Sequence, residues 1–319
     1  MSGVPEGRLS LLDREERHTA WLARYGLVAP ADTDQYRGYA LPRLIELAYP
    51  GVPETELELL TDLLGWYTVL DDHFDGPAGR DLRVARTLFR RFEDIVNGFG
   101  GGRWFAMPPA PWADSVSAAW ADLCRRQAQG RSAVWNRRSA RDWRDCLYTF
   151  VAETVHRSRG SGPSVVEALM LRRHASCLYP FLNLLERALD TEAPSGLRTH
   201  GPWHRLRTHT AEAAGLINDL FSLAREERRG SVFNTVLVLQ REHGVTRERA
   251  LEIVAERVRE LRRECVLLRE ECAAAYPECR GYLEATRHLV DAVETWARSS
   301  GRYSGPNSQL PGVSRVSLV

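Results

Sequence analysis

A group of aspartates near residue 70 has the spacing of a metal-binding motif. The segment DDHFD (71–75) directly follows the mostly apolar run 63–70. Asp71 and Asp75 are four residues apart, so on a helix their carboxylates share one face. Two such carboxylates repel each other unless a cation lies between them, and hard oxygen ligands favour magnesium or manganese. A solvated acidic helix end would give the same pattern, so this motif alone leaves both interpretations open.

A second set of oxygen ligands occurs in the segment NDLFSLARE (218–226). Asn218, Ser222 and Glu226 are spaced four residues apart and span about 80° of a helix circumference. An amide oxygen, a hydroxyl and a carboxylate aligned in this way form a compact site for one divalent ion. The alternative is a polar stripe on an exposed helix. Because the flanking residues are mostly apolar, such a stripe needs a partner, and we expect a metal ion.

Helices must position both motifs, because nearly every periodic segment has helical spacing. Apolar residues recur at i, i+3 and i+4 over 57–67, 84–95 and 250–268, which predicts helices with one buried face. The valine-rich run 232–239 could also form a buried strand. No nearby segment could pair with such a strand, so we predict a helix there too. The pattern indicates an all-α protein of about ten helices.

Breaker residues separate these helices without dividing the chain into two cores. Gly, Pro and Ser predict loops over 98–111, 157–163 and 193–202. We therefore predict one domain over residues 1–303. The Ser/Gly/Pro-rich segment 304–319 is predicted to be a flexible tail.

The composition excludes several classes of function. The 43 basic and 42 acidic residues leave a net charge of +1, so neither nucleic acid nor an anionic membrane is an expected partner. All the basic residues are Arg, which excludes chemistry that needs a lysine. The N-terminus lacks the apolar core of a signal peptide and no apolar run is long enough to span a bilayer, so we expect a cytoplasmic protein. The six cysteines form no CxxC pair and are expected to be reduced structural thiols.

The two oxygen-ligand motifs together resemble those of bacterial class I terpene synthases, or terpene cyclases. That family places an aspartate-rich motif before an N-D-x-x-S-x-x-x-E triad, the order found here. The segment RRHASCLYP (172–180) resembles the family's R-R-x-T-x-G-x-x-P segment. The resemblance makes Arg173 the diphosphate sensor and places Cys177 where the family usually has the effector glycine.

Further matches extend the resemblance to residue 303. Trp296 and the pair Arg302-Tyr303 resemble the family's C-terminal W…R-Y element, whose Arg and Tyr bind the diphosphate. Arg225 occupies a basic position that also contacts it.

The resemblance implies a fold, a cofactor and a reaction. The fold is the class I terpenoid synthase helical bundle around a central apolar pocket. The cofactor is a cluster of three Mg²⁺ ions, and the reaction is cyclisation of a linear prenyl diphosphate to a terpene hydrocarbon or alcohol, with release of diphosphate. A homodimer is left open. The expected metal ligands are Asp71, Asp75, Asn218, Ser222 and Glu226. The expected pocket residues are Trp66, Tyr67, Thr68, Phe181 and Trp296.

The length of the substrate is open. Farnesyl diphosphate is favoured because it is the commonest substrate of bacterial relatives of this length. Thr68 lies three residues before Asp71, where relatives often carry an aromatic residue, and the extra room would suit geranylgeranyl diphosphate. A monoterpene synthase is a further alternative. A chain-elongating prenyl diphosphate synthase uses lysines that this chain lacks, and a non-catalytic helical scaffold would not need both metal motifs.

Overall fold

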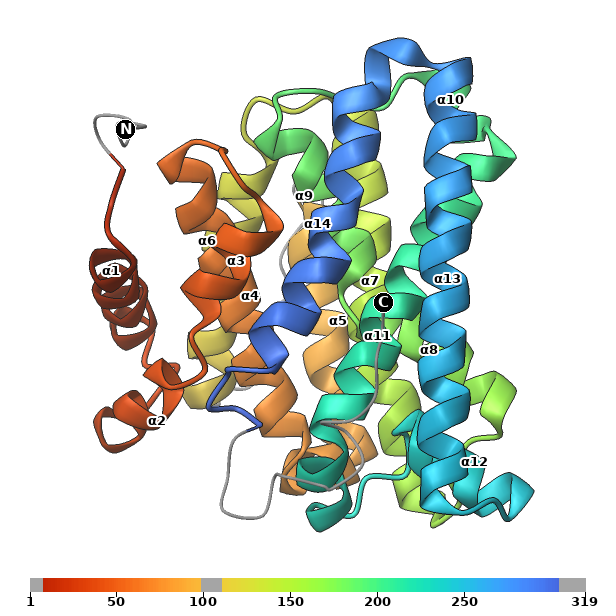
Figure 1. The fold of residues 1–319 in the computed structure, drawn as a ribbon. Helices are drawn as coiled ribbons and strands as arrows, with labels where there is room; N and C mark the ends of the chain where they lie inside the picture. The colour runs from red at the N-terminus through yellow and green to blue at the C-terminus, as the bar shows by residue number, and fades with distance from the viewer. Residues whose placement is uncertain (1–7, 99–110, 304–319) are drawn as a thin grey trace.

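The computed structural model describes residues 8–98 and 111–303 of the 319-residue chain. These ranges are helical and contain no β-strand, which confirms the predicted all-α fold class. The long helices run alongside one another as a bundle (Figure 1). The α-helices are α1 (Leu11–Arg24), α2 (Thr33–Arg37), α3 (Leu41–Ala48), α4 (Glu54–Phe74), α5 (Leu82–Gly98), α6 (Pro111–Ala128), α7 (Ala133–Arg159), α8 (Val165–Ala175), α9 (Leu178–Ala188), α10 (Ser195–Thr199), α11 (Gly201–Arg228), α12 (Thr235–His243), α13 (Arg247–Ala275) and α14 (Arg280–Ala297).

The apolar periodicity locates the long helices correctly. The patterns over 57–67, 84–95 and 250–268 lie inside α4, α5 and α13, each of which extends beyond its pattern. The valine-rich run is also helical, but only from Thr235, because the Asn234 side chain accepts the N–H of Val236 and caps the new helix. The described ranges contain fourteen α-helices rather than about ten, since short helices such as α2 and α10 have too few residues to show a period.

The predicted breaks hold where the structure describes them. Residues 157–163 span the end of α7 and the turn before α8, while 193–202 also contains the short α10. The glycine- and proline-rich segment falls between α5 and α6, and its residues 99–110 lie outside the described ranges, as does the predicted tail 304–319.

Helix α4 is central to the bundle and is buried on two sides. On one side Trp66 stacks on Trp120, with ring centroids 4.3 Å apart, and its indole N–H donates to the Val116 carbonyl at 2.9 Å. On the other side the neighbouring residues Tyr67 and Thr68 border a cavity. Trp66 therefore belongs to the core rather than to the predicted pocket wall.

The segment after α14 returns to the first third of the chain. The indole N–H of Trp296 donates to the Tyr39 carbonyl at 2.6 Å, and the Ser300 hydroxyl donates to the same oxygen at 3.0 Å. The Gly301 N–H donates to the Gly38 carbonyl at 2.8 Å. A Cβ on Gly301 would lie 2.6 Å from that carbonyl oxygen, so the close approach requires glycine. These contacts fix the position of the two residues that follow.

Helix length and polarity also bear on the environment of the protein. None of the helices in the two described ranges combines the length and apolar character that a membrane crossing requires.

All six cysteines are buried and unpaired, as predicted.

Candidate active site

A cavity of about 160 Å³ opens among α3, α4, α8, α9, α11 and α14. Its wall is apolar at one end and carries acids, amides and arginines at the other. The predicted site residues that line it are Tyr67, Thr68, Asp71, Cys177, Phe181, Asn218, Ser222, Arg225, Glu226, Trp296, Arg302 and Tyr303. Three other predicted residues, Trp66, Asp75 and Arg173, are not part of this lining.

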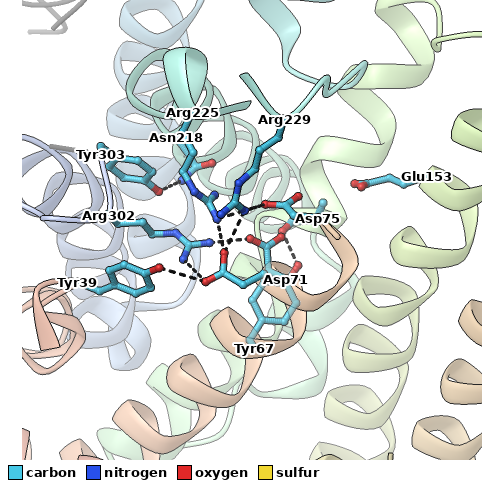
Figure 2. Close-up of polar contacts among 12 residues, drawn as sticks. Tyr39, Tyr67, Asp71, Asp75, Glu153, Asn218, Arg225, Arg229, Arg302 and Tyr303 are labelled. Carbon is cyan, nitrogen blue, oxygen red and sulfur yellow. Dashed lines mark hydrogen bonds and ion pairs between the residues drawn. The ribbon is translucent and has the colours of Figure 1, made fainter. Parts of the chain in front are cut away.

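The aspartate-rich motif forms a compact acidic group at the end of α4. Carboxylate oxygens of Asp71, Asp72 and Asp75 all lie within 4.8 Å of one another (Figure 2). Asp75 therefore contributes to this group although it lies outside the cavity lining. Asp72 was not among the predicted ligands, but its spacing of three residues from Asp75 was a signal for it. Three carboxylates at this separation suit a divalent cation.

Two arginines from distant parts of the chain, one on α11 and one after α14, neutralise these acids. Arg302 Nη2 lies 2.8 Å from Asp71 Oδ2, and its Nη1 lies 2.9 Å from Asp72 Oδ2. Arg225 pairs with Asp72 and lies 3.2 Å from Asp75 Oδ2. Burial opposes ionisation of Asp72, yet the Arg302 and Arg225 guanidinium groups hold its pKa below its usual value. Burial and the nearby Asp75 raise the pKa of Asp71 despite Arg302.

The second oxygen-ligand motif lies across the same cavity on α11. The Asn218 amide donates to the Tyr303 hydroxyl at 2.6 Å, and its oxygen accepts from Arg172. Glu226 accepts from the Asn234 amide at 3.1 Å. Ser222 is buried, and its hydroxyl has no hydrogen-bond partner among residues 8–98 and 111–303. A buried hydroxyl without a partner is costly, so an oxygen-seeking cation fits this donor set.

Asp219, beside Asn218, organises the turn behind this motif. The carboxylate accepts from the Thr235 N–H at 3.0 Å and from the Thr235 hydroxyl at 2.6 Å. Arg172 Nη2 lies 2.8 Å from its other oxygen. Burial nevertheless raises the pKa of Asp219 to about 6. This side chain therefore fixes the start of α12 rather than facing the cavity.

The predicted diphosphate sensor faces away from the cavity. Arg173 Nε donates to Glu212 at 2.7 Å, and the same carboxylate also pairs with Arg257. Consecutive helical residues point about 100° apart, and only one of these two adjacent arginines lines the cavity. Arg172 is that residue, and it lines the cavity beside Asn218. The signal for it was its position four residues after Ala168, which is buried.

Cys177 forms the break between α8 and α9. Its backbone is left-handed, with φ 61° and ψ 6°, a conformation that costs a non-glycine residue about 1 kcal/mol. Its carbonyl accepts the N–H of Phe181 at 3.3 Å, which starts α9. The thiol is buried, and burial raises its pKa well above the usual value. The left-handed backbone gives a physical reason for the glycine that the resemblance places at this position.

The apolar wall contains aromatic residues beside a larger number of aliphatic ones. Tyr49, Tyr67, Phe181 and Trp296 all border the cavity. The hydroxyls of Tyr49 and Tyr67 and the indole nitrogen of Trp296 donate to backbone carbonyls, so these polar groups are already satisfied. Sequence reasoning missed Tyr49, because α3 is too short to reveal which of its faces is buried.

Comparison with known proteins agrees with this geometry. Residues 62–264 match the family described as Terpene synthase family 2, C-terminal metal binding. Pentalenene synthase of Streptomyces avermitilis is 31% identical over 90% of this chain and 87% of its own length. A (2E,6E)-farnesyl diphosphate-cyclizing (−)-β-caryophyllene synthase of Saccharothrix espanaensis is 32% identical over 92% of this chain and 85% of its own length.

Solved structures give the same result. Wild-type cucumene synthase superposes with a TM-score of 0.72 at 27% identity, covering 90% of this chain and 95% of that one. The linalool/nerolidol synthase of Streptomyces clavuligerus shares the fold, with a TM-score of 0.80 over 93% of this chain and 100% of that one, at 24% identity. By its sequence, its fold and the metal-binding motifs at the cavity mouth, the chain belongs to the terpene synthase family and is a class I terpene synthase.

Proposed function

We propose that this enzyme ionises farnesyl diphosphate in a Mg²⁺-dependent reaction and cyclises the resulting carbocation to a sesquiterpene hydrocarbon or alcohol. The observation that carries the proposal is a single cavity with an apolar aromatic wall at one end and two sets of oxygen ligands at the other. A prenyl diphosphate has a long apolar chain and a charged diphosphate head, which would fit the apolar end and the polar end of this cavity.

The cation ligands fit the expected metal. Asp71, Asp72 and Asp75 would hold Mg²⁺ from one side of the cavity mouth, and Asn218, Ser222 and Glu226 would hold it from the other. Family resemblance gives three ions. Bound Mg²⁺ supplies positive charge that stabilises the leaving diphosphate.

Arginines and a tyrosine would bind the same leaving group directly. Arg172, Arg225, Arg302 and Tyr303 line the cavity at its polar end. In the structure Arg172 pairs with Asp219, Arg225 with Asp72 and Arg302 with Asp71. Arg225 and Arg302 would exchange these carboxylates for diphosphate oxygens when substrate and Mg²⁺ bind, and their charge would stabilise the leaving group. Arg172 takes the sensor role in this proposal, because Arg173 is bound to Glu212.

The apolar wall would protect and stabilise the cation. An aromatic face within reach contributes about 0.5–2 kcal/mol to a nearby positive charge. Tyr49, Tyr67, Phe181 and Trp296 offer such faces and exclude water that would quench the cation early. The final C–H proton can pass to a diphosphate oxygen, so no separate side-chain base is needed.

Farnesyl diphosphate is favoured because a curated relative carries that substrate in its name. Thr68 on the cavity wall keeps geranylgeranyl diphosphate as an alternative, and geranyl diphosphate is a third. Purified enzyme with Mg²⁺ should be incubated with each of the three, followed by analysis of volatile products. A cyclic C15 product formed fastest from farnesyl diphosphate is expected, and a preference for another chain length would overturn the substrate assignment.

A non-catalytic scaffold would behave differently in a simple binding assay. Inorganic diphosphate with Mg²⁺ should raise the melting temperature of an enzyme with this site, because both bind only the folded state. A scaffold without a working site would show no shift, and no turnover of any of the three substrates.

A further inference from the structure

Arg229 contacts the first acidic motif although it belongs to neither metal motif. It caps the C-terminus of α11, and its N–H donates to the carbonyls of Arg225 at 3.2 Å and Glu226 at 3.1 Å. Its Nη1 lies 2.6 Å from Asp75 Oδ2 and 3.4 Å from Asp72 Oδ1 (Figure 2). The backbone is thus fixed, while the side chain is 40% exposed and can turn toward solvent.

These are the oxygens that a divalent cation would use. Asp72 and Asp75 complete the group of three carboxylates within 4.8 Å. A guanidinium group hydrogen-bonded to Asp75 Oδ2 occupies one of its lone pairs and repels a second cation placed beside it. A metal ion bound at Asp75 must therefore displace Arg229 or bind against its charge.

Arg225 and Arg302 also contact the first acidic motif, but they differ from Arg229 in the cavity that they line. Arg225 and Arg302 line the main cavity, where a diphosphate would accept their hydrogen bonds. Arg229 does not line that cavity. It borders an adjoining cavity of about 290 Å³ that is also lined by Asp75, Arg80, Arg157 and Glu226, the last of which lines both cavities. In the structure Arg229 therefore contacts the acids without lining the cavity that would hold the substrate.

We propose that Arg229 is a positioning residue that competes with divalent cations for Asp72 and Asp75, and so raises the metal concentration at which the first motif fills. The metal role of these aspartates comes from the proposed function. The competition itself requires neither a prenyl substrate nor catalysis.

Manganese binding without substrate or diphosphate tests the proposal. Free Mn²⁺ is followed by electron paramagnetic resonance during titration of the wild type, Arg229→Gln, Arg229→Lys and Arg228→Gln. Arg228 is the matched control: it is the adjacent residue, exposed, and makes no ion pair within the described part of the chain. Arg229→Gln should bind the first Mn²⁺ about twofold to fivefold more tightly, the effect expected from losing a partly exposed ion pair. Arg229→Lys should retain most of the competition, and Arg228→Gln should match the wild type.

Two results would overturn the proposal. Unchanged or weaker Mn²⁺ binding by Arg229→Gln would show that the side chain does not compete. An equal gain in Arg228→Gln would show that net charge, rather than the contact with Asp75, sets the affinity. If the proposed function were wrong, the wild-type enzyme would turn over no prenyl diphosphate. That result would not depend on the order of Mn²⁺ affinities among the variants.

Discussion

Arg172 Nη2 lies 2.8 Å from Asp219 Oδ1, an ion pair that holds the Arg172 guanidinium group at the polar end of the cavity. Its neighbour Arg173 is bound to Glu212 instead. Arg172→Gln should therefore lower kcat by about 10²- to 10³-fold, as expected when a donor to a developing anion is lost. Arg173→Gln should stay within about threefold of the wild type. Steady-state release of diphosphate measures both, and a comparable loss in the two variants would contradict the assignment.

The rotation of one helix is why the sequence could not show which arginine of this pair lines the cavity. The shared face of Asn218, Ser222 and Glu226 could be predicted, because helix geometry alone aligns residues that are four positions apart. All three line the cavity. Which of two adjacent residues faces that cavity depends on the neighbouring helices, and no local pattern contains that information.

The same dependence on neighbouring helices explains why the sequence predicted both Trp66 and Tyr67 as pocket residues. Helix α4 is buried on two sides, so its apolar pattern does not distinguish core from cavity. Trp66 packs on Trp120, while Tyr67 borders the cavity. The contact between Arg229 and Asp75 joins residues 154 positions apart and could not be predicted from spacing at all. Periodicity was sufficient for the long helices, since each must bury one face wherever it packs.

Ser222→Ala tests the second metal motif without disturbing packing. The hydroxyl is buried and has no hydrogen-bond partner, so its loss should leave thermal stability in EDTA unchanged or slightly higher. The Mg²⁺ concentration for half-maximal activity should rise about tenfold if this hydroxyl is a cation ligand, as the proposed function requires. Ser139→Ala is the matched control, a buried and unpartnered hydroxyl outside the cavity lining. An unchanged Mg²⁺ requirement in Ser222→Ala would remove Ser222 from the ligand set.

Thr68→Phe tests the length of the substrate. Thr68 lines the cavity on the helix that carries Asp71, so a larger side chain should shorten the space available to the hydrocarbon. Turnover of geranylgeranyl diphosphate should fall most, then farnesyl, then geranyl diphosphate, as measured by competition among the three. Thr68→Val keeps the volume and should preserve the order of the wild type. An equal decrease for all three substrates would show that Thr68 does not limit chain length.

Glu153→Gln tests a buried acid near the aspartates. Burial raises the pKa of Glu153 to about 7, although Arg157 opposes the shift. Between pH about 4.5 and 7 the folded protein keeps a proton that the unfolded chain has released, so stability falls as the pH rises through this window. The glutamine mimics the protonated acid. Glu153→Gln should therefore be more stable than the wild type by about 3 kcal/mol at pH 8, with little difference at pH 4.

Urea unfolding at the two pH values measures this difference. Glu16→Gln, at an exposed position on α1, is the control and should show no such pH-dependent gain. A difference for Glu153→Gln that stays the same at both pH values would contradict the assigned titration.

The Tyr39 carbonyl accepts hydrogen bonds from Trp296 and Ser300, so this side of the site can form only after these late residues have been synthesised. Ser300 is synthesised 261 residues after Tyr39, the residue whose carbonyl it binds. Arg302 and Tyr303 are synthesised later still, after Asp71 and Asp72 on α4 and Asn218 on α11, the residues that they contact. Domains generally fold from the N-terminus as they are synthesised. Translation that stops before residue 300 would leave both oxygen-ligand motifs in place but without the contacts of Arg302 and Tyr303.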